Sequence, residues 1–197
     1  MTTLAVVRKN GQCAIAADTL TKWGSGKESA TYVTNHEKIF QVGDSYLAVT
    51  GSTTFKLILA EYFSQLETPP RFDSVPSIFR TWQELHAAMK ERYFLIATED
   101  KEDDLETSRF YILIANAHGI FGVAPHRAVQ EFSKFYAYGA GADYAMGALY
   151  ATYDQSKLNA EALARLAIEA AAEFDDSTSA PISSKIVRAA KTKPSET

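Results

Sequence analysis

Apolar and polar residues follow one another along this chain in a pattern that predicts strands first and helices afterwards. Two apolar runs, Leu4 to Arg8 and Cys13 to Asp18, flank Asn10-Gly11, which is the strongest short hairpin signal. Two further strand-like runs, Lys38 to Val42 and Tyr46 to Thr50, are separated by a Gly-Asp turn. We therefore expect two hairpins in the first quarter of the chain, joined by a polar stretch.

The following segments carry the period of an amphipathic helix. Ser52 to Leu66 places apolar residues three and four positions apart, and Ser52 or Thr53 could cap it. The same spacing predicts a second helix over Ile78 to Phe94 and, closer to the carboxyl end, helices over Asp143 to Tyr153 and Asn159 to Phe174. The charged run Glu99 to Asp104 predicts a solvated turn.

Strand patterns return between and after the helices. They cover Arg109 to Ala115, Ile120 to Val123, Phe132 to Tyr138 and Ile182 to Val187. The order of strands, two helices, strands, two helices and a strand predicts an α+β fold with sheets packed face to face and helices outside. We expect one domain over residues 1–190 and a flexible polar tail over residues 191–197.

Composition narrows the class of protein. The net charge of -4 provides no basic surplus for nucleic acid, and no run approaches the roughly 18 apolar residues of a membrane helix. The first residues do not resemble a secretory signal, so a cytoplasmic location is the simplest expectation. Cys13 lies in an apolar run and is expected to be buried. The four histidines are expected in turns or at the surface and lack metal-binding spacing, so neither a metal nor a cofactor is expected.

Thr2 is the first candidate for chemistry. Removal of Met1 would leave a free α-amine beside the Thr2 hydroxyl, and an amine with a pKa of about 7.7–8.0 can act as its base. Asp18 ends one predicted strand and Lys38 begins another, so both could converge on Thr2. A lysine near the amine would keep it neutral, and a carboxylate would hold that lysine charged. The alternative is that these strand-end charges face water.

Two glycine sites follow predicted strands and precede helices. Gly51 stands after Tyr46 to Thr50, where a backbone N–H can face a developing oxyanion beside a helix N-terminus. Gly139-Ala140-Gly141 has the same strand-to-helix setting. Each site could equally be an ordinary turn that requires small residues.

Taken together, these residues resemble the β-type proteasome subunits and the bacterial HslV peptidase, which are N-terminal nucleophile hydrolases. The resemblance spans most of the chain and is nearest to a bacterial proteasome homologue that is neither a typical HslV nor an actinobacterial or archaeal proteasome. It rests on these segments: Thr2-Thr3-Leu4-Ala5-Val6, Ala16-Ala17-Asp18, His36 to Val42, Thr50-Gly51-Ser52, Tyr138 to Ala145 and Ala170 to Ser179.

The resemblance implies a four-layer αββα sandwich and a threonine-type endopeptidase. It makes Thr2 the nucleophile and amine base, Asp18 and Lys38 the charge pair, and the Gly51 N–H the oxyanion donor. Asp175 and Thr178 match supporting residues near the nucleophile, although Asp176 competes for the register and the polar residues could instead form a solvated loop. The residues that match the family's substrate cleft are Thr21, Lys22, Val49 and Thr53.

The resemblance also implies partners. These are peptides or unfolded proteins as substrates, other copies of the chain in stacked hexameric or heptameric rings, and an ATP-dependent unfoldase. One departure is Ala140, which stands where proteasomal β-subunits carry a serine. Two alternatives stay open: a catalytically silent structural subunit, favoured by Ala140 or by retention of Met1, and an amidase for small molecules.

Overall fold

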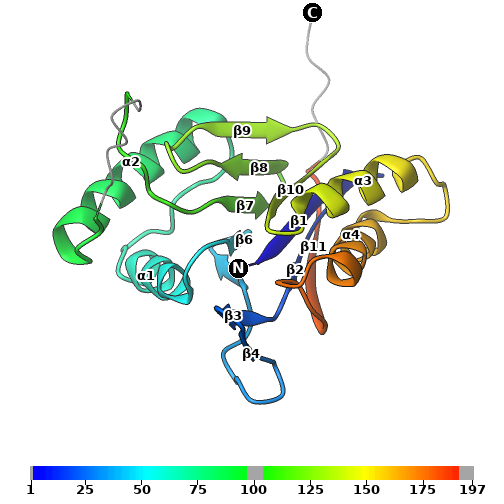
Figure 1. Ribbon diagram of the computed structural model, residues 1–197. Helices are drawn as coiled ribbons and strands as arrows, with labels where there is room; N and C mark the ends of the chain where they lie inside the picture. The colour runs from blue at the N-terminus through cyan, green and yellow to red at the C-terminus, as the bar shows by residue number, and fades with distance from the viewer. Residues whose placement is uncertain (1, 97–103, 191–197) are drawn as a thin grey trace, which may run out of the picture.

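The computed structural model describes residues 2–96 and 104–190 (Figure 1). The predicted tail over residues 191–197 and most of the predicted charged turn, residues 99–103, lie outside the described residues. Within the described ranges, no helix combines the length and the apolar content needed to cross a membrane.

Two antiparallel sheets form the centre of the molecule. The first sheet has the order β10-β1-β2-β11 and the second has the order β5-β6-β7-β8-β9. The strands of the first sheet are β1 (Thr3–Lys9), β2 (Gln12–Asp18), β10 (Phe135–Gly139) and β11 (Ile182–Arg188). Those of the second are β5 (Ile39–Val42), β6 (Ser45–Val49), β7 (Ile112–Ala115), β8 (Ile120–Val123) and β9 (Val129–Phe132). Both hairpins predicted near the amino terminus are confirmed.

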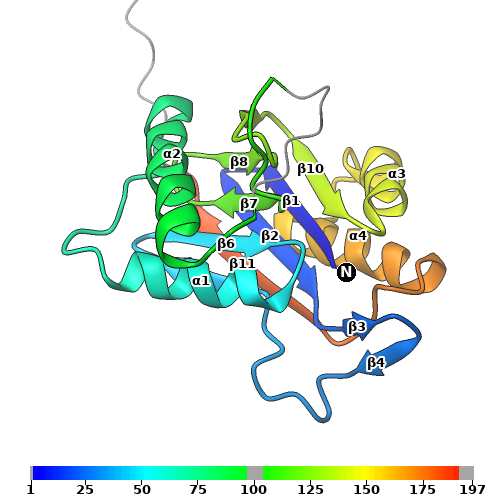
Figure 2. The same ribbon diagram turned by 60° about the vertical axis from the view of Figure 1, so that its left-hand side comes forward.

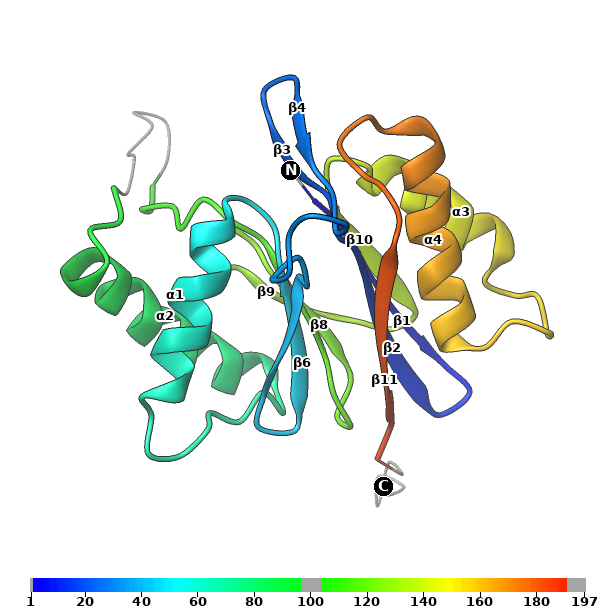
Figure 3. The same cartoon turned by 90° about the horizontal axis from the view of Figure 1, so that it is seen from below.

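Two pairs of helices enclose the sheets. They are α1 (Thr53–Ser64), α2 (Val75–Arg92), α3 (Ala142–Thr152) and α4 (Ala160–Phe174). Figure 3 shows the four layers edge-on, with α1 and α2 outside the second sheet and α3 and α4 outside the first. Ser52 and Asn159 cap α1 and α4, as the sequence predicted. The predicted αββα sandwich is confirmed.

Alternation of side chains along β1 explains why the layers stack. Ala5 and Val7 pack on the α3 and α4 side, whereas Leu4 and Val6 pack between the two sheets. Successive residues of a strand face opposite sides, so one short strand contributes to both apolar layers. Cys13 is fully buried between the sheets, which confirms its predicted burial.

Several predicted boundaries are wrong. Phe132 to Tyr138 is not one strand: β9 ends at Phe132 in the second sheet and β10 begins at Phe135 in the first, with a bend between them. The bend carries neither Gly nor Pro, so the aromatic run gives no sign of a change of sheet. The strand predicted from Arg109 begins only at Ile112. Arg109 adopts a positive φ of 64°, which lies outside the extended region, so it cannot be part of the strand.

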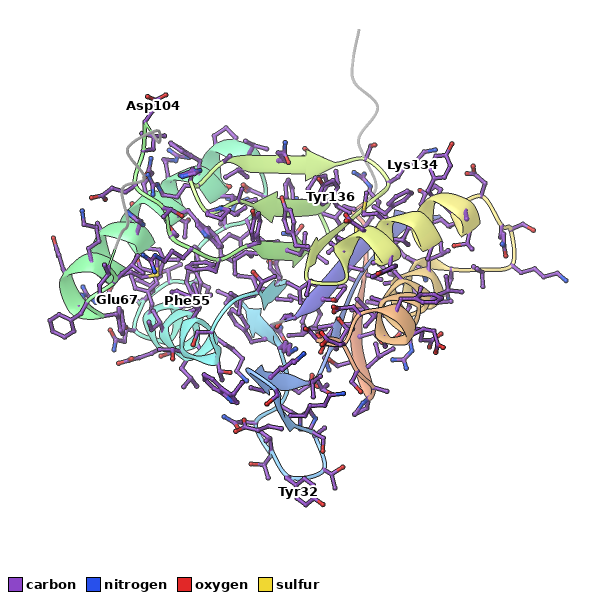
Figure 4. All side chains as sticks on the ribbon, in the orientation of Figure 1. Tyr32, Phe55, Glu67, Asp104, Lys134 and Tyr136 are labelled. Carbon is purple, nitrogen blue, oxygen red and sulfur yellow. The ribbon has the colours of Figure 1, made fainter. Side chains whose placement is uncertain are left out.

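A small hairpin was missed in the polar stretch after Asp18. Strands β3 (Thr21–Trp23) and β4 (Gly26–Glu28) pair with each other and form a separate two-stranded sheet. Figure 4 labels Tyr32 at the far end of the segment that follows β4, away from the layers, and this side chain is 88% exposed. Three-residue strands with charged side chains lack the apolar alternation on which sequence analysis depends.

His86 is also not where the sequence placed it. This residue lies on α2 and is buried, with Nδ1 2.9 Å from the Ser108 hydroxyl and Nε2 3.1 Å from Glu106 Oε2. Burial lowers the pKa of His86, although the Glu106 carboxylate opposes the shift. The hydrogen bonds of the His86 ring therefore connect α2 to the segment before β7. His118 and His126 are exposed, as expected.

Asn116 fixes the turn between β7 and β8. Its amide nitrogen donates to Phe72 O at 2.8 Å and to the Ser45 hydroxyl at 3.1 Å. Its amide oxygen accepts hydrogen bonds from the backbone N–H groups of His118 and Gly119. One fully buried side chain thus connects the second sheet to the segment before α2.

Replacing Asn116 by Ala is expected to lower the free energy of unfolding by about 2–4 kcal/mol, because several buried polar groups lose their partner. Asn159→Ala is the comparison, since it removes one exposed cap on α4 and should cost about 1 kcal/mol. Urea unfolding of both variants measures the difference. Equal losses in the two variants would contradict the role assigned to Asn116.

Candidate active site

The backbone of Thr2 is held by the loop after β10. Its carbonyl accepts a hydrogen bond from the Ala140 N–H at 2.9 Å, and the residue is only 5% exposed. Gly139 has a φ of 110°, and a Cβ there would lie 1.8 Å from the Thr2 carbonyl oxygen. Only glycine permits this approach, so Gly139 determines where the chain begins β1. Figure 2 shows the amino terminus between β10 and β3.

Asp18 and Lys38 form a buried ion pair beside this start of β1. Lys38 Nζ lies 2.8 Å from Asp18 Oδ1 and also donates to Leu20 O at 2.7 Å. The same carboxylate accepts the Thr3 N–H at 2.9 Å and the Leu20 N–H at 3.0 Å. Asp18 ends β2 and Lys38 precedes β5, so the pair joins the two sheets. Because both residues are buried, the alternative that these charges face water is wrong.

Burial dominates the acid–base properties of this pair. It lowers the pKa of Lys38, and the Asp18 carboxylate opposes the shift while the Lys56 cation adds to it. Burial likewise raises the pKa of Asp18, against the Lys38 charge and two backbone N–H donors. The lysine consequently loses its proton more readily than a lysine in water.

A second polar cluster lies behind Thr2. The Gly141 N–H donates to Thr3 Oγ1 at 2.9 Å, and the Thr178 hydroxyl donates to Asp175 Oδ2 at 2.5 Å. The hydroxyl oxygens of Thr3 and Thr178 are 2.5 Å apart. Since Thr178 gives its proton to Asp175, Thr3 is the donor between the two hydroxyls. The hydrogen bonds therefore run in one direction, from Gly141 to the Asp175 carboxylate.

This cluster shows which of the two neighbouring aspartates, Asp175 or Asp176, faces Thr178, and it also contains Thr3. Asp175 faces Thr178, whereas Asp176 pairs with Lys22 at 2.6 Å, so the two neighbouring carboxylates have different partners. Thr178 is buried, which excludes a fully solvated loop. Thr3 was not proposed as a site residue, and its only signal was its place directly after Thr2.

Gly51 lies at the turn between β6 and α1. Its φ of 92° favours glycine, and a Cβ there would lie 3.1 Å from the Phe55 ring, a tight contact. The next residue, Ser52, is the N-cap of α1. The turn therefore lies beside the positive end of the helix dipole.

All these elements meet around a cavity of about 960 Å³. Thr2, Lys38 and Gly51 line it, whereas Asp18, Asp175 and Thr178 are not among its lining residues and are connected to Thr3 by hydrogen bonds. The four residues predicted for substrate binding, Thr21, Lys22, Val49 and Thr53, all line the same cavity. Lys22 is not free at the surface, because its side chain is 11% exposed and bonded to Asp176.

Sequence reasoning missed the aromatic part of the cavity wall. Tyr111, Tyr136 and Tyr138 line it, and they belong to strands or strand ends that are distant from Thr2 in the sequence. No motif marks Tyr111 or Tyr136, and Tyr138 opens a segment that carries the resemblance but was not proposed as a site residue. Across residues 2–96 and 104–190, no group of three or more His, Cys, Asp or Glu side chains could hold a metal ion.

The arrangement provides the parts of an acyl-transfer site. A threonine hydroxyl stands at the wall of a cavity, a buried cation lies close to the start of the same strand, and a glycine turn at a helix N-terminus completes the wall. Such a set can activate a hydroxyl and stabilise negative charge on a carbonyl oxygen.

Known proteins share this architecture. No protein-family model and no curated protein sequence matches the chain. Among solved structures, Thiobacillus denitrificans BPH is 61% identical with a TM-score of 0.93, covering 96% of this chain and 100% of that chain. The same protein in complex with epoxomicin is 60% identical with a TM-score of 0.91 and the same coverage. Eukaryotic HslV from Trypanosoma brucei is 20% identical with a TM-score of 0.64, covering 95% of this chain and 99% of that chain.

The HslV likeness shows a shared fold, at an identity too low to carry more. The likeness to BPH is much stronger, because it combines a nearly superimposable fold with 60% sequence identity over the whole of that chain. The expected resemblance is therefore confirmed, and this protein belongs to the BPH family of bacterial proteasome-like proteins.

Proposed function

We propose that this chain is an N-terminal threonine endopeptidase subunit of a self-compartmentalising ring peptidase, acting through Thr2 once Met1 is removed. One observation carries the proposal: Thr2 is held at the wall of a large cavity by Gly139 and Ala140, beside the buried Asp18–Lys38 pair. A hydroxyl and an amine on one residue form a complete nucleophile and base.

The reaction begins when Thr2 Oγ attacks the peptide carbonyl. The α-amine of Thr2 takes the hydroxyl proton and passes it to the leaving amine, so the C–N bond breaks as an ester forms. A water molecule then attacks the ester and gives its proton to the same amine, which returns it to Thr2 Oγ as the ester C–O bond breaks and the acid product leaves. Positioning by the Gly139 loop places hydroxyl and amine together before substrate arrives.

Lys38 keeps the amine in its neutral form, which is the form that can accept a proton. Its positive charge disfavours protonation of a nearby amine, and Asp18 holds the lysine in place by a bond of 2.8 Å. The Gly51 N–H, at the amino-terminal side of α1, donates to the oxyanion of the tetrahedral intermediate. Asp175 and Thr178 act as positioning residues, since their hydrogen bonds reach Thr3 next to the nucleophile.

The substrates are peptides or unfolded proteins, and the working form is a double ring of six or seven subunits per ring. Exposed aromatic side chains on α3 and α4, including Tyr150 at 85% and Phe174 at 68% exposure, offer apolar surface for neighbouring subunits. An ATP-dependent unfoldase would then deliver substrates, in the cytoplasm.

A catalytically silent structural subunit is the second candidate. Ala140 favours it, because this residue lines the cavity next to Thr2 with no hydroxyl to bind water or the amine. The two candidates differ in whether Thr2 reacts.

The first prediction concerns the reactivity of Thr2. Because T. denitrificans BPH has been solved in complex with epoxomicin, we expect epoxomicin to form one covalent adduct per chain with this protein. Intact mass spectrometry should show loss of Met1 before treatment and one adduct afterwards. Thr2→Ala should form none, whereas Thr3→Ser, which keeps the neighbouring hydroxyl, should retain it. Retained Met1, or a free Thr2 without adduct, would favour the silent subunit.

The second prediction concerns pH. The neutral amine of Thr2 is the base, so kcat/KM should rise with pH through an amine pKa that Lys38 holds below the ordinary value of about 7.7–8.0. At higher pH the rate should fall as Lys38 loses its proton, and burial brings that limb below the ordinary lysine range. Peptide hydrolysis from about pH 5 to about pH 10 measures both limbs.

Two variants assign the limbs. Lys38→Arg keeps a charge that does not titrate in this range, so the residual activity should lack the basic limb. Lys38→Met leaves Asp18 buried without its cation and should reduce kcat/KM by about 100-fold or more. An unchanged basic limb in Lys38→Arg would show that another group causes it.

A further inference from the structure

One wall of the cavity is aromatic. Tyr111, Tyr136 and Tyr138 all line it. The rings of Tyr111 and Tyr138 are 4.7 Å apart at their centroids, and those of Tyr136 and Tyr138 are 5.2 Å apart. Figure 4 labels Tyr136 near the place where β10 passes the second sheet, and β10 contacts β7 there. We call Tyr111, Tyr136 and Tyr138 the tyrosine wall.

The tyrosine wall lies on one side of Thr2 only. Thr2 leads into β1, whose neighbours in the first sheet are β2 on one side and β10 on the other. Thr21 follows β2 and Tyr138 belongs to β10, so these two lining residues stand on opposite sides of Thr2. In the second sheet, Lys38 precedes β5 and Tyr111 precedes β7, with β6 between them.

The two sides of the cavity therefore differ in chemistry. The side after β2 mixes charged groups, among them Lys22 with its partner Asp176, with the exposed ring of Trp23 on β3. The opposite side presents the tyrosine wall. A polypeptide that lies across Thr2 must place one flank of its scissile bond on each side.

Packing holds the tyrosine wall rigid. A Cβ at Gly122, on β8, would lie 2.9 Å from the Tyr138 ring and 2.8 Å from the Phe132 ring, so glycine leaves the space that both rings fill. Phe132 in turn stacks on Tyr136, with centroids 4.3 Å apart and an interplanar angle of 2°. Burial raises the pKa of Tyr138 to about 12, so this part of the wall stays uncharged near neutral pH.

Tyr111 is the accessible member. It is 39% exposed, while its backbone is fixed by hydrogen bonds of its N–H to Thr50 Oγ1 and of its carbonyl to the Thr50 N–H. A ring with a fixed base and an open face can stack on a ligand without losing much conformational freedom.

We propose that Tyr111 and Tyr138 form a specificity subsite that takes an aromatic or large aliphatic side chain on one flank of the scissile peptide bond. The assignment rests on the proposed peptidase function for its role in turnover. The opposite flank meets Lys22 and Trp23, so any preference there does not depend on Tyr111.

The kinetic test uses two peptide sets that vary one residue, before or after a cleavage site located by mass spectrometry. In one of the two sets, Phe or Leu should raise kcat/KM over Gly or Glu by about threefold to tenfold through contact with Tyr111. Tyr111→Ala should remove this preference by raising KM for the Phe peptide while leaving the Gly peptide unchanged. Tyr111→Phe should keep it. Tyr32→Ala, which changes a tyrosine that is 88% exposed and does not line the cavity, is the matched control.

A binding arm separates this inference from the proposed function. Fluorescent Phe and Gly peptides are titrated into Thr2→Ala chains with and without Tyr111→Ala, where no turnover is needed. The Phe peptide should bind more tightly only when Tyr111 is present.

Tyr111→Leu replaces Tyr111→Ala if the latter does not fold, and it should reduce the advantage of Phe over Leu. Equal binding of both peptides, or an advantage unaffected by the Tyr111 variants, would overturn the subsite, whereas absent hydrolysis with retained selective binding would overturn only the peptidase.

Discussion

The buried ion pair between Asp18 and Lys38 is the interaction on which the site depends. It joins the end of β2, an inner strand of the first sheet, to the residue before β5 in the second sheet. The pair therefore holds the two sheets together at this end. Burying two charges is costly unless each has further partners, and here Asp18 accepts two backbone N–H groups while Lys38 also donates to Leu20 O. One of those N–H groups belongs to Thr3. The pair therefore orders the start of β1 as well as the charge beside it.

The loop after β10 also holds the start of β1, because glycines in the loop allow its backbone to lie close to Thr2 and Thr3. Gly139 allows the loop after β10 to lie against the Thr2 carbonyl, and Gly141 lets the same loop reach Thr3 Oγ1, where a Cβ would lie 2.8 Å away. The hydroxyl bonds from Thr3 to Thr178 and Asp175 then connect this loop to the segment after α4. Thr2 is consequently positioned by three separate parts of the chain, which is the preorganisation that a nucleophile needs.

The sequence predicted the individual strands and helices better than the places where the chain passes from one layer to another. The apolar runs of β1 and β2 and the helical spacing in α1 and α4 are local signals, so their ends were placed within about two residues, which is usual for element boundaries. The change of sheet between Phe132 and Phe135 has no local signal, since it depends on which sheet each aromatic side chain meets. The same limit applies to the site. Asp18 and Lys38 stand out at strand ends, whereas the partner of Asp175 and the proximity of Tyr111 to Tyr138 exist only after folding.

The cavity separates chemistry from recognition, and the strand order explains why. The acid–base groups come from β2 and the segment before β5, on one side of Thr2, while the tyrosine wall comes from β10 and the start of β7 on the other. The bonds described for the Asp18–Lys38 pair come from the two side chains, Thr3 and Leu20, so they do not depend on the tyrosine wall. In the proposed mechanism, the residues that flank a cleaved bond are therefore recognised apart from the charges beside Thr2. The cost is that the wall needs its own packing support, and Gly122 on β8 provides it by leaving room for the rings of Phe132 and Tyr138.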